Sequence, residues 1–243
     1  MKKLIAVFLL ALLPALALAA EQGGPALEKV DIDLADKAAL QDGARTFTNY
    51  CMGCHSAKFQ RYERVADDLG IPHDLMLQKL VFTGAKIGDH MTIGMQPADA
   101  KAWFGAAPPD LTLVARVRGT DWLYGYLRSF YEDPARPWGV NNTVYPNVAM
   151  PNVLGELQGR QVLACKQAQG AQACEQLALL PNTGSLTPEQ FNEKIKNLVT
   201  FLDYSANPNK LKSERIGAYV LLYLAVLFIF AYLLKREYWK DVH

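Results

Sequence analysis

The sequence has almost no net charge and very little cysteine. Its 243 residues contain 25 Lys and Arg against 24 Asp and Glu, which gives a net charge of +1. A nucleic-acid-binding domain needs a basic face or stripe, so this balance gives no support to a nucleic-acid partner. Only four cysteines are present, and sites that depend on thiols are therefore few.

Two of the cysteines lie in the run Cys51-Met52-Gly53-Cys54-His55. C-x-x-C-H is the run to which a c-type haem is covalently attached. On one turn of helix, two thiols three residues apart can each reach one vinyl group of the same porphyrin. The next residue then directs its imidazole at the iron, and axial ligands of this kind tune the iron. The run predicts one covalent haem c on Cys51 and Cys54, with His55 as a ligand of the iron.

A zinc knuckle and a thiol redox pair are the alternatives for this run. A structural zinc site usually needs a second pair of ligands at similar spacing. The other two cysteines, Cys165 and Cys174, lie far away in the chain and do not supply such a pair. A redox pair, for its part, does not need a histidine directly after its second cysteine. Both alternatives are therefore weaker than the haem interpretation.

The chain begins with the basic run Met1-Lys2-Lys3 and an apolar run from Leu4 to about Leu18. Ala17-Leu18-Ala19 has the small-x-small pattern of a cleavage site, so residues 1–20 are predicted to be a secretory signal peptide. An uncleaved anchor is the alternative. Export is consistent with haem attachment outside the cytoplasm and permits disulfides. Cys165 and Cys174 are accordingly predicted to form a disulfide that closes a short polar loop.

A second apolar run, Ile216 to Leu234, has nineteen residues without a charge. It is long enough to cross a bilayer as a helix, and a segment that is apolar all round at a chain end is an unusual core helix. The division predicted from both runs is a signal peptide (1–20), a periplasmic haem domain (21–209), a transmembrane anchor (210–235) and a cytoplasmic tail (236–243). The predicted location is the bacterial inner membrane, crossed once.

Apolar periodicity predicts a helix at each end of the haem domain. The first runs from about Ala35 to the haem motif, with Leu40, Ala44, Phe47 and Cys51 on one face, and Gly43 leaves a gap where another helix can cross closely. The second starts at the capping box Thr187-Pro188-Glu189-Gln190. Short helices are predicted over Ser56–Leu69, Leu75–Thr83 and Asp121–Tyr131, with a loop from Glu132 to Pro151.

The sixth ligand of the iron must be a methionine or a histidine. Met52 lies inside the attachment turn, Met76 has helical spacing with Leu80, and His73, His90, Met91 and Met95 are predicted to be surface residues. Met150 lies in the proline-stiffened run from Tyr145 to Pro151, which predicts a rigid, non-helical segment that holds the sulfur against the iron. A neutral thioether favours Fe(II) and suits an electron carrier. A bis-histidine iron is the alternative.

Taken together, these motifs resemble the cytochrome c1 family, the haem subunits of cytochrome bc1 complexes. The resemblance covers about residues 25 to 240 and includes Arg61-Tyr62, Pro108-Pro109-Asp110-Leu111 and Ala149-Met150-Pro151. It implies a mainly α fold: a class I cytochrome c-like haem domain with long loops and one C-terminal transmembrane helix. It also implies that Pro109 borders the haem and that Arg118, or else Arg116, contacts a propionate. Trp122 stands where the family has a tyrosine near that propionate.

The same resemblance implies a function. The chain would be the c-type cytochrome subunit of a respiratory quinol–cytochrome c oxidoreductase, with no substrate turnover of its own. Electrons would come from a Rieske iron–sulfur protein and leave to a cytochrome c, with cytochrome b beside the anchor, in a dimeric complex. A free-standing, membrane-tethered cytochrome c that serves an oxidase is the alternative. A haem sensor or peroxidase would need an open sixth position, and Met150 argues against it.

Overall fold

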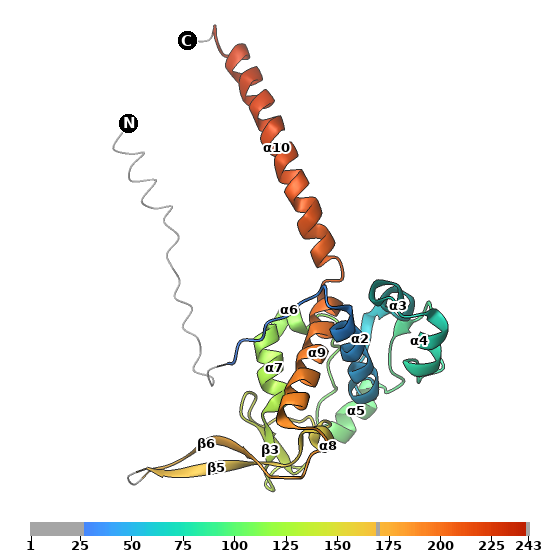
Figure 1. The fold of residues 1–243 in the computed structure, drawn as a ribbon, viewed down its shortest axis with the longest axis vertical. Coiled ribbons are helices and arrows are strands. Elements are labelled where there is room, and N and C mark those ends of the chain that lie inside the picture. Colours follow the sequence, from blue (N-terminus) through green and yellow to red (C-terminus); the bar gives the residue numbers. More distant parts are fainter. Residues whose placement is uncertain (1–26, 169–170, 242–243) are drawn as a thin grey trace.

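The computed structural model describes residues 27–168 and 171–241. The described chain forms a helical globular part from which one long helix, α10 (Lys210–Tyr238), extends (Figure 1). The globular part is built around α9 (Pro188–Ala206), which lies between α2 (Lys37–Thr46) and α7 (Thr120–Arg128). The predicted signal peptide, residues 1–20, lies outside the described residues.

The start of α9 is the predicted capping box. The Thr187 hydroxyl accepts a hydrogen bond from the Gln190 backbone N–H at 3.3 Å, and the Gln190 side chain accepts one from the Thr187 backbone N–H at 3.0 Å. Two donors that a helix start leaves unpaired are thereby satisfied. Phe191, Ile195 and Leu198 are buried along the helix, as their spacing predicts. The sequence prediction for this helix is confirmed.

Helix α2 begins one residue after its cap, Asp36, whose side chain accepts hydrogen bonds from two backbone N–H groups of the first turn. It continues as a π-helical turn, η1 (Phe47–Cys51), which ends on the first cysteine of the haem motif. Gly43 touches α9: a Cβ atom there would overlap the Asn197 carbonyl oxygen and lie 2.7 Å from the Phe201 Cβ atom. The close crossing predicted from Gly43 is confirmed.

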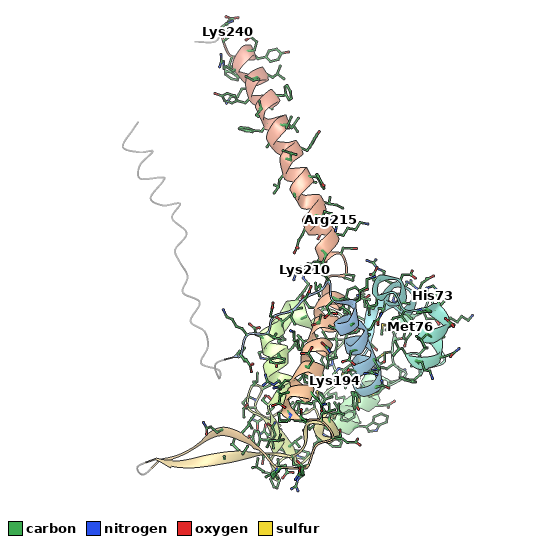
Figure 2. The ribbon with its side chains drawn as sticks, viewed as in Figure 1. His73, Met76, Lys194, Lys210, Arg215 and Lys240 are labelled. Atoms are coloured by element: carbon green, nitrogen blue, oxygen red, sulfur yellow. The ribbon has the colours of Figure 1, made fainter. Side chains whose placement is uncertain are left out.

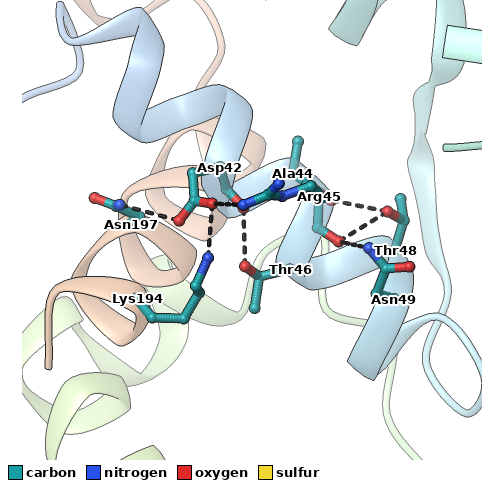
Figure 3. Close-up of polar contacts among 8 residues, drawn as sticks. All are labelled: Asp42, Ala44, Arg45, Thr46, Thr48, Asn49, Lys194 and Asn197. Carbon is teal, nitrogen blue, oxygen red and sulfur yellow. Dashed lines mark hydrogen bonds and ion pairs between the residues drawn. The ribbon is translucent and has the colours of Figure 1, made fainter. Parts of the chain in front are cut away.

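A polar cluster joins the same two helices beside this crossing (Figure 3). The Asp42 carboxylate accepts hydrogen bonds from Lys194 Nζ at 2.7 Å, Asn197 Nδ2 at 3.1 Å and an Arg45 amino group at 2.6 Å. Burial raises the pKa of Asp42, but the hydrogen bonds from Lys194, Asn197 and Arg45 outweigh it, so the net shift is downward. The carboxylate is therefore ionised near neutral pH and can hold α2 to α9.

The predicted helix over Ser56–Leu69 is wrong in its first half. Residues Ala57–Arg61 form strand β1, paired with β2 (His90–Met91), and only Tyr62–Leu69 is helical, as α3. The backbone N–H groups of Lys58 and Phe59 bind the side chains of Asp110 and Thr112, which keeps this stretch extended.

Met91 is also not a surface residue, contrary to the prediction. It pairs with Ala57 across the β1–β2 ladder and is fully buried. No pattern in the sequence indicates this burial, because a two-residue strand has no periodicity of its own. The burial of Met91 follows from its pairing with Ala57.

The region before α9 contains more strand than the sequence predicts. Helix α7 ends at Arg128, and β3 (Phe130–Glu132) pairs with β4 (Val140–Asn142) inside the predicted loop. The predicted polar loop around Cys165 and Cys174 is a hairpin of β5 (Gln161–Ala168) and β6 (Ala171–Leu179), which projects from the globular part (Figure 1). The remaining helices are α4 (His73–Lys79), α5 (Pro97–Phe104), α6 (Val114–Arg118) and α8 (Gly155–Gln158).

Helix α10 is the one helix in the described part that is long and apolar enough to cross a membrane, and none of its residues is buried. Figure 2 shows Lys210 and Arg215 near the globular part and Lys240 beyond the far end. Basic residues thus flank both ends of the apolar stretch. The predicted fold class, mainly α with one C-terminal membrane helix, is confirmed.

Gly43→Ala should destabilise the protein, because the added methyl group meets the α9 backbone, which cannot rotate away. Overpacking of this kind costs about 1–3 kcal/mol or more and should exceed the gain of about 1 kcal/mol in helix propensity. We expect the thermal midpoint in detergent to fall by about 5 °C. Gly94→Ala is the matched control, since a Cβ atom there has no atom within 4 Å. An unchanged midpoint in Gly43→Ala would contradict the crossing geometry.

Candidate haem site

The haem motif folds as a tight turn at the end of η1. The Cys51 carbonyl oxygen accepts hydrogen bonds from the backbone N–H groups of Cys54 at 3.1 Å and His55 at 2.9 Å. Cys51 is buried and Cys54 is half-buried, and both thiols are free. Single π-helical turns occur often at functional sites, and this one ends where the attachment motif begins.

His55 is held in one tautomer by the proline pair. Its Nδ1 lies 2.7 Å from the Pro109 carbonyl oxygen, and the ring is 9% exposed. A carbonyl oxygen only accepts, so Nδ1 carries the hydrogen and Nε2 presents its lone pair. Burial lowers the pKa of His55, while the Pro109 bond and Asp110 act in the opposite direction. The result is a neutral, oriented imidazole, which is the form that binds a metal.

The two alternatives for the cysteine pair fit this geometry poorly. Burial, with a smaller contribution from Cys54, raises the pKa of the Cys51 thiol to about 12. A redox-active thiol needs a lowered pKa, because the thiolate is the reactive form. Among the side chains that the structure describes, which do not include those of residues 165–175, no group of three or more His, Cys, Asp or Glu is placed to hold a metal ion. The thiol redox pair and the zinc knuckle are both disfavoured.

Met150 lies on a segment without helix or strand, as predicted, and its side chain is half-buried. Side chains hold this segment in place. The Asn142 side-chain oxygen accepts hydrogen bonds from the backbone N–H groups of Val144 and Tyr145, and that of Asn141 accepts one from Asn147 at 2.8 Å. The prolines therefore act together with an asparagine pair that the sequence prediction did not consider.

An aromatic row connects Met150 to Arg118. The Tyr126 hydroxyl donates to the Met150 sulfur at 3.4 Å, and the Tyr126 ring stacks on Trp122 with centroids 4.9 Å apart. The Arg118 guanidinium lies over the Trp122 ring at 4.9 Å and near the Tyr145 ring at 5.9 Å. The Tyr126 and Trp122 rings thus connect one predicted propionate residue, Arg118, to the predicted sulfur ligand.

Tyr126 is the site residue that sequence reasoning missed. Its spacing of four from Trp122 on a predicted helix is a signal that could have found it. Burial raises the pKa of Tyr126, so the hydroxyl stays protonated and remains a donor. Arg116, the second propionate candidate, is exposed in α6, with no contact to this row among the described side chains.

The other candidate ligands lie elsewhere. Met76 and Met91 are fully buried in the core, and Met52 is buried within the attachment turn. His73 is exposed on α4 and lies 2.7 Å from Asp67, its partner on α3 (Figure 2). His90 is exposed and Met95 is half-buried.

The residues present fit a c-type haem. Two free thiols stand three residues apart in a turn, and the next residue offers an unprotonated ring nitrogen at a partly buried position. Cys51, Ala115 and Leu154 all belong to one cluster of buried apolar side chains.

Comparisons with known proteins find a matching family and similar chains. A model of the Cytochrome C1 family matches residues 30–242. Cytochrome c1 of Allochromatium vinosum is 51% identical over 245 residues, which covers 100% of both chains. The ammonia monooxygenase gamma subunit of Nitrosomonas europaea is 40% identical over 242 residues, which covers 99% of this chain and 100% of that one. Cytochrome c1 of Rhodospirillum rubrum is 27% identical and covers 92% of this chain and 91% of its own.

Proposed function

The chain belongs to the cytochrome c1 family, and from this we infer that it is the haem subunit of a respiratory quinol–cytochrome c oxidoreductase. Electrons reach its haem from a Rieske iron–sulfur protein and leave to a cytochrome c. The observation that carries the proposal is the hydrogen bond between His55 Nδ1 and the Pro109 carbonyl oxygen. It orients an axial nitrogen directly beside the two attachment thiols, and this is what an electron-transfer haem needs.

Cys51 and Cys54 would hold one haem c covalently, and the bound haem would supply a metal centre that takes up and releases one electron. His55 Nε2 and the Met150 thioether would be the two protein ligands of its iron. Pro109 orients the imidazole through its carbonyl oxygen, while burial favours the neutral form of the ring. Arg118 is the proposed partner of a haem propionate, with Arg116 as the second candidate.

Met150 and Tyr126 together set the electronic character of the site. A neutral sulfur ligand stabilises Fe(II) relative to Fe(III), which raises the reduction potential. The Tyr126 hydroxyl, 3.4 Å from that sulfur, withdraws electron density from it and acts in the same direction. The pair therefore favours a haem that accepts an electron from a high-potential iron–sulfur partner.

We place the protein in the bacterial inner membrane, with the haem domain in the periplasm and the C-terminus in the cytoplasm. The support is the single apolar helix α10, whose direction follows from a predicted signal peptide at the other end of the chain. Cytochrome b is the proposed partner of this helix, as membership of the cytochrome c1 family implies. The assembly is a dimer, as the family resemblance implies.

Co-purification tests this function most directly. Extraction of the native membrane in mild detergent should yield this chain with a b-type haem and a Rieske centre, detected by absorbance and by electron paramagnetic resonance (EPR). A c-type haem that purifies alone would support the tethered carrier that serves an oxidase. One relative is named as a monooxygenase subunit, so the co-purifying proteins should also be identified directly.

Met150→Leu should keep the haem attached, because attachment requires only Cys51, Cys54 and the turn at His55. Loss of the sulfur removes the preference for Fe(II), so the reduction potential should fall by at least about 120 mV, or two tenfold steps in the one-electron equilibrium. A redox titration followed by haem absorbance measures the change.

Two further variants make this titration specific. Tyr126→Phe keeps the sulfur and removes one hydroxyl, so its potential should fall by less than about 59 mV, one tenfold step. Met95→Leu should leave the potential unchanged. A normal potential in Met150→Leu together with a large loss in Met95→Leu would assign the ligand to Met95.

We also propose that Cys165 and Cys174 form a disulfide. The two residues are Cα partners across the β5–β6 hairpin, and a closed loop of about ten residues contributes about 3 kcal/mol by the chain-entropy estimate. Thiol labelling of the exported protein should modify neither cysteine before reduction and both after it. Labelling of both without reduction would exclude the bond.

A further inference from the structure

The connection between the globular part and the membrane helix is very short. Helix α9 ends at Ala206 and α10 begins at Lys210, which leaves three residues, Asn207 to Asn209, between them. No residue of α10 is buried against the globular part. Packing therefore does not determine the direction of α10, and contacts at its first turn must do so.

A cluster of four side chains, here called the anchor joint, supplies such contacts. The Arg64 guanidinium donates to the Asp68 carboxylate within α3 and, through Nη2, to Asn209 Oδ1 at 2.9 Å. The Tyr204 hydroxyl donates to the same Asp68 carboxylate at 2.7 Å. The cluster thus links α3, the end of α9 and the residue that precedes α10.

The Tyr204 hydroxyl remains protonated over the physiological pH range. Tyr204 is 5% exposed, whereas the side chains of Arg64 and Asp68 are 44% and 32% exposed. Burial raises the pKa of Tyr204, and the Asp68 carboxylate raises it further. The hydroxyl therefore stays a donor, and it shares a charged acceptor with the guanidinium, an arrangement stronger than a neutral hydrogen bond.

The joint is continuous with the haem turn. Strand β1 and helix α3 follow His55 directly in the chain, and the Gln60 amide on β1 donates to the Ser205 carbonyl oxygen at 2.7 Å in a buried contact. The segment that follows the attachment turn therefore makes two side-chain hydrogen bonds to the last turn of α9, one through Gln60 and one through Asp68. A second link, between Lys210 and Asp203 at 3.4 Å, joins α10 to α9 but does not reach α3.

We propose that Arg64, Asp68 and Tyr204 are positioning residues that hold the haem at a fixed orientation to the membrane. The proposal rests on the proposed function, because it concerns the haem that function requires. Exposed ion pairs contribute little to overall stability. Their role here is directional: in the described part, they are the side-chain contacts that link α3 to the start of the anchor.

The test uses the full-length, haem-loaded chain without partners in oriented lipid multilayers. EPR of the ferric haem should depend strongly on the angle between the membrane normal and the field. In the double variant Asp68→Asn, Tyr204→Phe, at least half of this angular dependence should be lost, while the haem spectrum and reduction potential stay unchanged. If Asp68 and Tyr204 only stabilised the fold, the double variant would change the haem spectrum as well.

Asp67→Asn is the matched control. Asp67 is the neighbouring carboxylate on α3 and pairs with His73 instead of the joint, so the variant should keep the full angular dependence. Arg64→Gln removes the hydrogen bond to Asn209 and changes only a half-exposed side chain. It replaces the double variant in this test if the double variant does not take up haem. Full angular dependence in Arg64→Gln and in the double variant would overturn the proposal, as would its absence in the unmodified protein.

Hydrogen exchange provides a readout that does not need the haem. Peptides that cover residues 203–213 should exchange at least tenfold faster in the double variant, whereas peptides from α6 and α7 should not change. If the chain carried no haem, the proposed function would fail, and exchange at residues 203–213 would still decide whether the joint holds. Equal exchange in both proteins would overturn the joint.

Discussion

The close contact between Gly43 and the Asn197 carbonyl oxygen is the constraint on which the arrangement of the whole molecule depends. Helix α2 leads into η1 and the attachment turn, while α9 leads into the membrane helix. Where these two helices cross without a side chain between them, α2, which leads to the attachment turn, is packed directly against α9. The ionised Asp42 carboxylate, with Lys194 on α9, adds polar contacts beside the crossing. Loss of the contact at Gly43 or of the contact between Asp42 and Lys194 would loosen the packing of α2 on α9.

The two sides of the candidate iron site are held by different means. His55 follows directly after η1 and is oriented by a single carbonyl oxygen, that of Pro109, more than fifty residues later in the chain. Met150 belongs to an irregular segment, whose backbone N–H groups are bound by the side chains of Asn141 and Asn142. Irregular segments keep a defined shape only when their polar groups have partners. The asparagine pair therefore allows a loop to present a sulfur atom.

The sequence predicted the parts of this arrangement that local chemistry determines. The capping box at Thr187 and the gap at Gly43 depend on residues within a few positions, and both are confirmed. The strand Ala57–Arg61 was predicted as helix because its extended shape depends on Asp110, which lies about fifty residues away. Tyr126 was missed because its importance comes from contact with a loop residue. Partners that are distant in sequence leave no local pattern.

The short connection between α9 and α10 bears on the choice between a complex subunit and a tethered carrier. A carrier that shuttles electrons needs a flexible linker, and flexible linkers are rich in glycine and serine. Here the connection is Asn207-Pro208-Asn209, in which proline restricts the backbone and Asn209 receives a hydrogen bond from Arg64. A haem held in this way cannot travel to distant partners. Its partners must come to it or be fixed beside it, which supports a subunit whose donor and acceptor dock at a stationary haem domain.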